Sequence, residues 1–167
     1  YVSQPFGLYN TNETFNAFQA SASLGSKAGD WAWFIHVNRT DSHGQPLTFA
    51  TRLRSAGVAS AAGTAVTGAV ADANNSKAPI FILGTGTEYH TIQDHFKVKL
   101  AYDINPTVRA SYTMGLWQNT SEGRPVSYLR NAAGQPVYSG AVNINGLAFT
   151  GANALTGGDF TLNNESL

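Results

Sequence analysis

From His95 to Trp117, apolar and polar residues alternate along the chain on both sides of Pro106. This alternation restricts the chain to β-sheet structure. With the two-residue repeat of a strand, one face of each run is apolar and the other is polar or charged. We therefore predict a β-hairpin with one apolar face and one polar face. The apolar face holds Phe96, Val98, Leu100, Tyr102 and Ile104 before the turn, and Val108, Ala110, Tyr112, Met114 and Leu116 after it.

The same alternation occurs upstream, where "FQASASL" and "WAWFIHVN" flank a glycine-containing turn. Both hairpins combine long strands with a short turn, whereas the segments that join and follow them are far longer than ordinary connections. We predict four spanning strands and two long loops. The strands cover about 14–25, 31–40, 94–104 and 107–118, and the loops cover 41–93 and 119–167.

Short turns at one end and long loops at the other are typical of an outer-membrane barrel, with the turns in the periplasm and the loops outside the cell. Aromatic residues gather at the turn ends, as in the aromatic girdle of such barrels. The apolar face carries no charge within the central spans, where a basic side chain facing lipid would cost roughly 2–4 kcal/mol. On the opposite face, Lys97, Lys99, Asp103 and Arg109 would line a watery lumen.

Composition narrows the classes of function. Only 12% of the residues are charged, about half the usual share of a soluble protein. Ten basic and ten acidic residues give a formal charge of zero, which speaks against a nucleic-acid surface. Without cysteine, disulfides and thiolate metal sites are excluded. The longest uncharged run, 55–71, is too rich in small and polar residues for a transmembrane helix.

Two alternatives fit the same alternation. One is a soluble, secreted β-sandwich that binds carbohydrate, in which the apolar faces cover each other. The other is a small complete outer-membrane barrel, porin-like or structural, in which four loop pieces supply further strands. Those pieces are "PLTFATR", "APIFILG", "VSYLR" and "PVYSGAV". Against this alternative, "APIFILG" and the longer stretch "VSYLRNAAGQPVYSG" are short for spanning strands and have prolines where a ladder donor is needed.

Three stretches of the sequence resemble the barrel region of TonB-dependent outer-membrane receptors, and together with the segments between them the resemblance covers most of the chain. They are "FQASASLGSKAGDWAWFIHVNRTDSHGQPLTFAT", "HFKVKLAYDINPTVRASYTMGLWQN" and "YLRNAAGQPVYSG", with "GDW" after one short turn and "YDINP" at another. The resemblance implies an all-β fold, an antiparallel up-and-down transmembrane barrel segment in the bacterial outer membrane. It also implies uptake of a scarce nutrient such as an iron–siderophore complex, driven by an inner-membrane energy-coupling protein.

The sequence departs from that family in showing no plug domain and no coupling box, and four strands cannot close a barrel. We therefore expect residues 1–167 to be a partial β-barrel domain of a larger receptor, whose energy coupling runs through a plug outside this sequence. The expected partners are a small-molecule nutrient or siderophore and outer-membrane lipid.

No catalytic or metal-binding motif appears, so we expect no enzyme activity, no cofactor and no metal. Four histidines match no zinc signature, and Ser, His and Asp occur without a nucleophile elbow. Loops on a rigid wall usually carry ligand binding, and Arg and aromatic side chains suit an anionic chelate. The candidate ligand-binding residues are His43, Arg52, Arg54, Tyr89, Tyr128, Arg130 and Tyr138. Packing of the loops against each other is the alternative role for these side chains.

Overall fold

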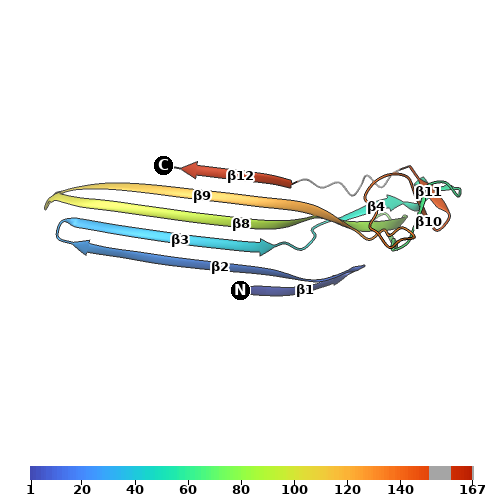
Figure 1. The fold of residues 1–167 in the computed structure, drawn as a ribbon, viewed down its shortest axis with the longest axis horizontal. Helices are drawn as coiled ribbons and strands as arrows, with labels where there is room; N and C mark the ends of the chain where they lie inside the picture. Colours follow the sequence, from blue (N-terminus) through green and yellow to red (C-terminus); the bar gives the residue numbers. More distant parts are fainter. Residues whose placement is uncertain (151–158, 167) are drawn as a thin grey trace.

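The computed structural model is an all-β protein built on one long antiparallel sheet (Figure 1). It describes residues 1–150 and the backbone of 159–166. The strand order in the long sheet is β1-β2-β3-β8-β9-β12, and all neighbours along this path are antiparallel. The strands are β1 (Val2–Leu8), β2 (Thr11–Ala28), β3 (Trp31–His43), β8 (Pro79–Asn105), β9 (Val108–Ser127) and β12 (Asp159–Ser166).

The two predicted hairpins are present with shorter turns and longer strands than the sequence indicated. Two residues join β2 to β3, and Gly29 takes a φ of 58° there, a left-handed conformation that glycine adopts without penalty. Pro106 and Thr107 join β8 to β9. Both turns lie at one end of the molecule, as Figure 1 shows. The predicted strands 14–25, 31–40 and 94–104 lie within these longer strands, and 107–118 does so except for Thr107, which belongs to the turn.

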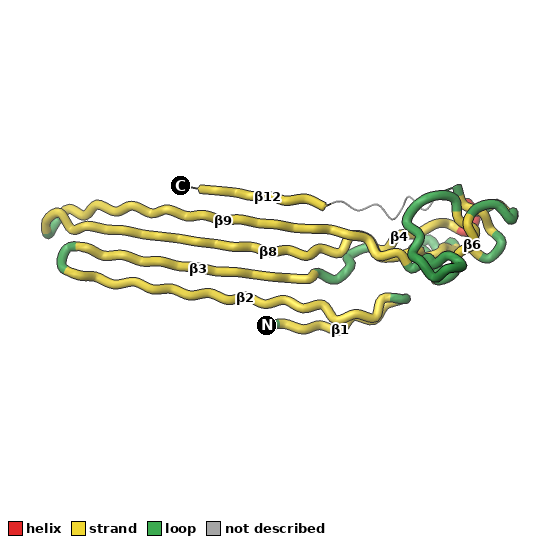
Figure 2. Tube along the Cα trace, viewed as in Figure 1, coloured by secondary structure: helices red, strands yellow, loops and turns green. Residues whose placement is uncertain are grey.

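The opposite end of the molecule carries a compact unit, which we call the distal unit (residues 49–83 and 128–150; Figure 2). A second, four-stranded sheet lies in it, with the order β5-β11-β10-β6 and one parallel pair, β10 with β6. Its elements besides the start of β8 are β4 (Phe49–Leu53), a 3₁₀ turn (Arg54–Ala56), β5 (Val58–Ala59), β6 (Thr64–Val66), β7 (Val70–Ala73), β10 (Val142–Ile144) and β11 (Leu147–Phe149).

The prediction of continuous loops over 41–93 and 119–167 is wrong for residues 79–93, 119–127 and 159–166. They belong to β8, β9 and β12, and β4 to β7 add short strands within 41–93. Beyond the apolar stretch the paired faces carry Thr, Ser, Gln and Asn, as in the Thr91–Ser121 and Gln93–Asn119 pairs. The pairing of β8 with β9 therefore continues beyond the segment in which apolar and polar residues alternate.

The hydrophobic core lies in the distal unit. Leu83 and Leu129 are fully buried, and Phe81 and Phe149 pack edge to face with ring centroids 6.1 Å apart. A smaller cluster of Ile80, Ile82 and Tyr128 lies beside it. The larger cluster consists of Ala50, Val66, Phe81, Leu83, Leu129, Val142, Ile144 and Phe149. The start of β8 thus provides residues to both clusters, which anchors the distal unit on the long sheet.

Candidate functional site

The most distinctive surface is one face of the long sheet, which we call the apolar face. Residues in register across β2, β3, β8 and β9 form rows on it, and the central row is Leu24, Ile35, Val98 and Met114. Leu24 is 67% exposed and Ile35 37% exposed, so this row is not covered by other described residues. Large hydrophobic side chains lie open along the face, among them Leu24, Trp31, Ile35, Val37, Leu100, Tyr102 and Tyr112.

An aromatic pair bounds the apolar face at the turn end. Trp31 and Tyr102 are partners in the ladder, and their ring centroids lie 4.7 Å apart. Trp31 is 57% exposed and Tyr112, further along the same face, is 58% exposed. Such rings have an apolar body and a polar edge, which suits a boundary between an apolar and an aqueous medium.

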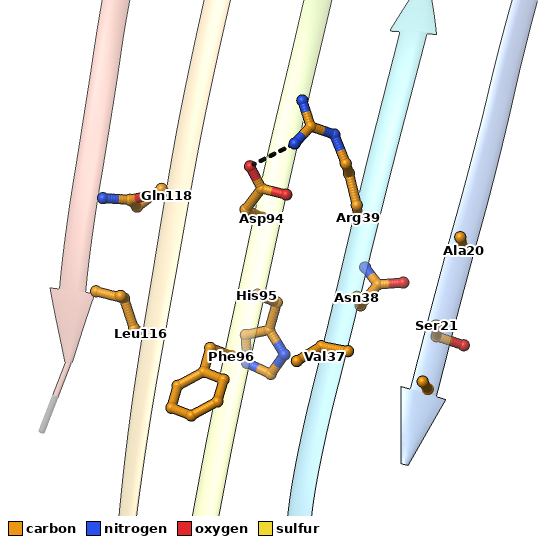
Figure 3. A pocket seen from close by; sticks show the side chains of 11 residues that line it. Ala20, Ser21, Val37, Asn38, Arg39, Asp94, His95, Phe96, Leu116 and Gln118 are labelled. Atoms are coloured by element: carbon orange, nitrogen blue, oxygen red, sulfur yellow. Dashed lines mark ion pairs between the residues drawn. The ribbon is translucent and has the colours of Figure 1, made fainter.

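A charged row bounds the apolar face at its other end. The row consists of Arg39, Asp94 and Gln118, which are partners in the ladder, and Arg39 Nη1 lies 3.6 Å from Asp94 Oδ2. A groove of about 520 Å³ opens where this row meets Phe96 and Leu116 (Figure 3). The groove therefore has an apolar floor and a polar rim, with Ala20, Ser21, Ala22, Val37, Asn38 and His95 completing the lining.

The opposite face of the long sheet, which we call the polar face, is built on hydrogen bonds and ion pairs. Near the turns, Asp103 accepts from Lys27 Nζ at 2.6 Å and lies 3.4 Å from Arg109 Nε. Midway along the sheet, His36 Nδ1 lies 2.8 Å from the Ser23 hydroxyl, and its ring is 5.8 Å from that of His95. The two faces of one sheet thus differ sharply in chemistry.

A cluster of three side chains of metal-binding types, one aspartate and two histidines, lies beyond the charged row, on the same side of the sheet as the apolar face. Asp41 Oδ1 is 2.9 Å from His90 Nε2, and the rings of His43 and His90 stack with centroids 3.9 Å apart. One ligand atom from each of Asp41, His43 and His90 lies within 4.8 Å of the others. His43 and His90 also line a cavity of about 420 Å³, together with Glu13, Thr14, Phe15, Asn16, Gly44, Glu88, Tyr89, Glu122, Arg124 and Val126.

Glu88 and Tyr128 are the titratable groups of this region with shifted pKa values. Burial raises the pKa of Glu88, although a hydrogen bond from Thr85 lowers it in part, and the nearby Glu13 carboxylate adds to the rise. Glu88 Oε1 is buried with no hydrogen-bond partner among the described residues. Burial likewise raises the pKa of Tyr128, whose hydroxyl is hydrogen-bonded to Thr11.

The turn between β1 and β2 is attached to the distal unit by polar contacts. Tyr9 donates to Asp72 Oδ2 at 2.6 Å, and the Asn10 amide donates to the carbonyl oxygen of Gly68 at 2.8 Å. The hydrogen bond from Tyr9 lowers the pKa of the Asp72 carboxyl and raises that of the Tyr9 hydroxyl. The first hairpin of the chain therefore supports the distal unit from the side.

The structure distributes the seven residues predicted to bind ligand over several places. Tyr128 is buried, and Arg130 Nη1 donates to the carbonyl oxygens of Ser127 and Leu129, so both act in packing. Arg52 is the ladder partner of Phe81, and the Arg54 guanidinium lies over the same ring, 5.2 Å from its centroid. His43 joins the Asp41–His90 cluster. Tyr89 and Tyr138 are exposed side chains.

Sequence reasoning missed Asp41 and His90 as neighbours of His43. The available signal was the alternation of Asp41 and His43 on one strand face, which places two ligand types side by side. His90 meets them only because β3 and β8 pair in the register that sets His43 opposite His90. That register extends the ladder far into the segment predicted to be a loop.

Comparison with known proteins found no match: no family model, no curated protein and no solved structure is similar to this chain. In the described part of the chain, no helix has the length and apolar character needed to cross a membrane. The resemblance to TonB-dependent receptors therefore stays a prediction from sequence.

Proposed function

We propose that this chain forms part of the wall of an outer-membrane β-barrel, with the distal unit standing outside the cell. The observation that carries the proposal is the apolar face, an exposed band that ends in an aromatic pair on one side and a charged row on the other. Exposed apolar patches of this extent mark sites that contact another apolar medium or partner. Lipid fits best, because the band crosses every long strand at the same level.

The length of the band supports this assignment. From Asp94 to Tyr102 the strand advances eight residues, or roughly 27 Å at about 3.4 Å per residue. A strand tilted by about 40° would raise this band by roughly 21 Å, close to the ~25 Å apolar band of outer-membrane barrels. The aromatic pair would then lie at the periplasmic interface, and the Arg39–Asp94 row at the outer interface.

Within this proposal the polar face lines a water-filled interior, and the chain acts in capture and uptake of a nutrient. Lys97, Lys99 and Arg109 on that face would attract an anionic solute such as an iron–siderophore complex. The distal unit, built from the long connections, would contact the solute first. Energy coupling would act through a plug domain outside this sequence, as the resemblance to TonB-dependent receptors implies.

The small complete barrel is less consistent with the arrangement of the strands. "APIFILG" forms the start of β8, and "PLTFATR" includes most of β4, which pairs with that start. Both lie in the distal unit, beside core residues such as Phe81 and Ala50. Residues 128–141, which include most of "VSYLR" and "PVYSGAV", contain only isolated bridges. None of the four pieces adds a further long strand beside the apolar band.

The soluble β-sandwich is disfavoured by the position of the core. Two packed sheets would bury the central row of Leu24, Ile35, Val98 and Met114, as sandwiches do. In residues 1–150, the buried hydrophobic clusters lie in the distal unit, and Leu24 and Ile35 are exposed. Residues 1–150 thus provide no second sheet over this face, which a sandwich requires.

The test is to locate and size the native polypeptide with an antibody raised against the mainly exposed segment 131–140. A band in outer membranes that resists alkaline washing, and is several times larger than 17.7 kDa, supports the receptor. A membrane band near 17.7 kDa refutes the receptor and favours the small barrel. Release of the band by washing refutes the membrane assignment altogether.

A further inference from the structure

We propose that Asp41, His43 and His90 form a binding site for a borderline divalent metal ion, with Zn²⁺ as the representative ligand. Two imidazoles and one carboxylate are a ligand set that suits Zn²⁺, Cu²⁺ and Ni²⁺, and three protein ligands leave a fourth position open. The inference does not depend on the proposed transport function, because it rests on the local geometry of two paired strands.

The backbone fixes the three side chains relative to each other. His43 and His90 are direct partners in the antiparallel ladder, so their side chains project from the same face of the sheet. Asp41 lies two residues before His43 on β3 and therefore shares that face. The ligands come from the interiors or ends of long strands rather than from a separate loop, which keeps their Cβ atoms close without a metal.

The distances already match metal coordination for two of the three ligands. Two donors bound to one metal at about 2.0–2.1 Å are roughly 2.9–3.4 Å apart for ligand angles between 90° and 109°. Asp41 Oδ1 and His90 Nε2 are 2.9 Å apart. His43 reaches the same metal position by rotation about its side-chain bonds, because all three ligand atoms lie within 4.8 Å of one another.

Metal binding at His90 requires only a change of tautomer. A proton on Nε2 would make the hydrogen bond to Asp41, whereas a proton on Nδ1 leaves the Nε2 lone pair for the metal. The Asp41 carboxylate then exchanges that hydrogen bond for a bond to the cation. The metal loses water molecules from its hydration shell in the process, and no co-reactant is needed.

The surroundings favour a cation and leave room for the open position. The adjoining cavity contains three carboxylates, those of Glu13, Glu88 and Glu122, and one guanidinium, that of Arg124. Glu122 is the ladder partner of His90, so its side chain projects from the same face of the sheet as the three proposed ligands. Its carboxylate lies 3.8 Å from the Arg124 guanidinium, which holds it beside the site.

The test is calorimetric titration of Zn²⁺ into the full 167-residue chain in detergent micelles, produced without an affinity histidine tag. We expect one Zn²⁺ per chain. His43→Ala and His90→Ala should each weaken binding at least about tenfold, since loss of a group that merely orients a ligand already costs 10–100-fold. His43→Cys should retain binding, because thiolate also binds zinc.

The matched control is the double variant His36→Ala and His95→Ala, which removes a neighbouring pair of histidines on the polar face. It should bind Zn²⁺ as the unmodified chain does. Far-UV circular dichroism establishes that each variant keeps its strands, and Cu²⁺ paramagnetic resonance of the unmodified chain should show nitrogen ligands. Absence of binding, or equal affinity in His43→Ala, His90→Ala and the control, overturns the proposal and leaves an Asp–His hydrogen bond only.

Discussion

Replacing Val98 with arginine tests whether the apolar face contacts lipid. Val98 belongs to the central row and lies four residues from both Asp94 and Tyr102, midway between the two boundaries of the band. A basic side chain at the midplane of an outer-membrane barrel costs about 2–4 kcal/mol. With a urea m-value of about 2 kcal/mol/M, the midpoint of unfolding should fall by roughly 1–2 M.

The assay is urea unfolding of the protein in phospholipid vesicles, followed by the fluorescence of its three tryptophans. The matched control is Ser21→Arg, because Ser21 is exposed on the polar face and its ladder partner, Asn38, is uncharged. We expect its free energy of unfolding to change by no more than about 0.5 kcal/mol, as for a surface substitution, which is roughly 0.25 M in the urea midpoint at the same m-value. Equal midpoints for Val98→Arg, Ser21→Arg and the unmodified protein would refute the assignment of the apolar face to lipid.

Two further predictions concern the distal unit, and a third concerns Glu88 in the cavity beside His43 and His90. Leu129→Ala should destabilise it by about 2–5 kcal/mol, because Leu129 is fully buried in its core, and limited proteolysis should then cut 128–150 faster. Gly68→Ala should cost about 1–3 kcal/mol, seen as a lower melting temperature, because Gly68 has a φ of 90° and an added Cβ would clash with the Tyr128 carbonyl. Burial raises the pKa of Glu88, so this group favours folding while it is protonated, and that stability is lost as pH rises through the raised pKa. Glu88→Gln should therefore flatten the pH dependence of unfolding above the ordinary pKa of a glutamate, about 4.3, and an unchanged profile would contradict this account.

The alternation of apolar and polar residues predicted the four long strands and both of their faces, because every second side chain of a strand lies on the same face. It failed beyond Asp94 and Gln118, where both faces are polar and pairing leaves no hydrophobic signature. Pro79 argued against a strand, yet it is the first residue of β8, a position that tolerates proline. Pro125 lies beside a shift of register, another such position.

The distal unit was beyond sequence reasoning because its sheet joins distant segments. β6 at Thr64–Val66 pairs in parallel with β10 at Val142–Ile144, and no local pattern indicates a partner so far along the chain. The chemistry of Tyr128 and Arg130 suggested ligand binding, and the fold gives Tyr128 a buried hydrogen bond to Thr11 and Arg130 part-buried hydrogen bonds to backbone carbonyl oxygens. The Asp41–His90 contact could not be predicted either, because it depends on the register in which β3 pairs with β8.

The continuity of β8 determines how the molecule bears a mechanical load. Its 27 residues extend roughly 90 Å at about 3.4 Å per residue, from the distal unit to the β8–β9 turn. Ladder hydrogen bonds lie perpendicular to the strands, so a pull along β8 loads them in shear and many must break together. Bending is different, because the β8–β9 register shifts between Gly84 and Thr87, where the distal unit begins. Tension is therefore transmitted along the strand, while a sideways push on the distal unit loads that joint and the Tyr9–Asp72 and Asn10–Gly68 hydrogen bonds beside it.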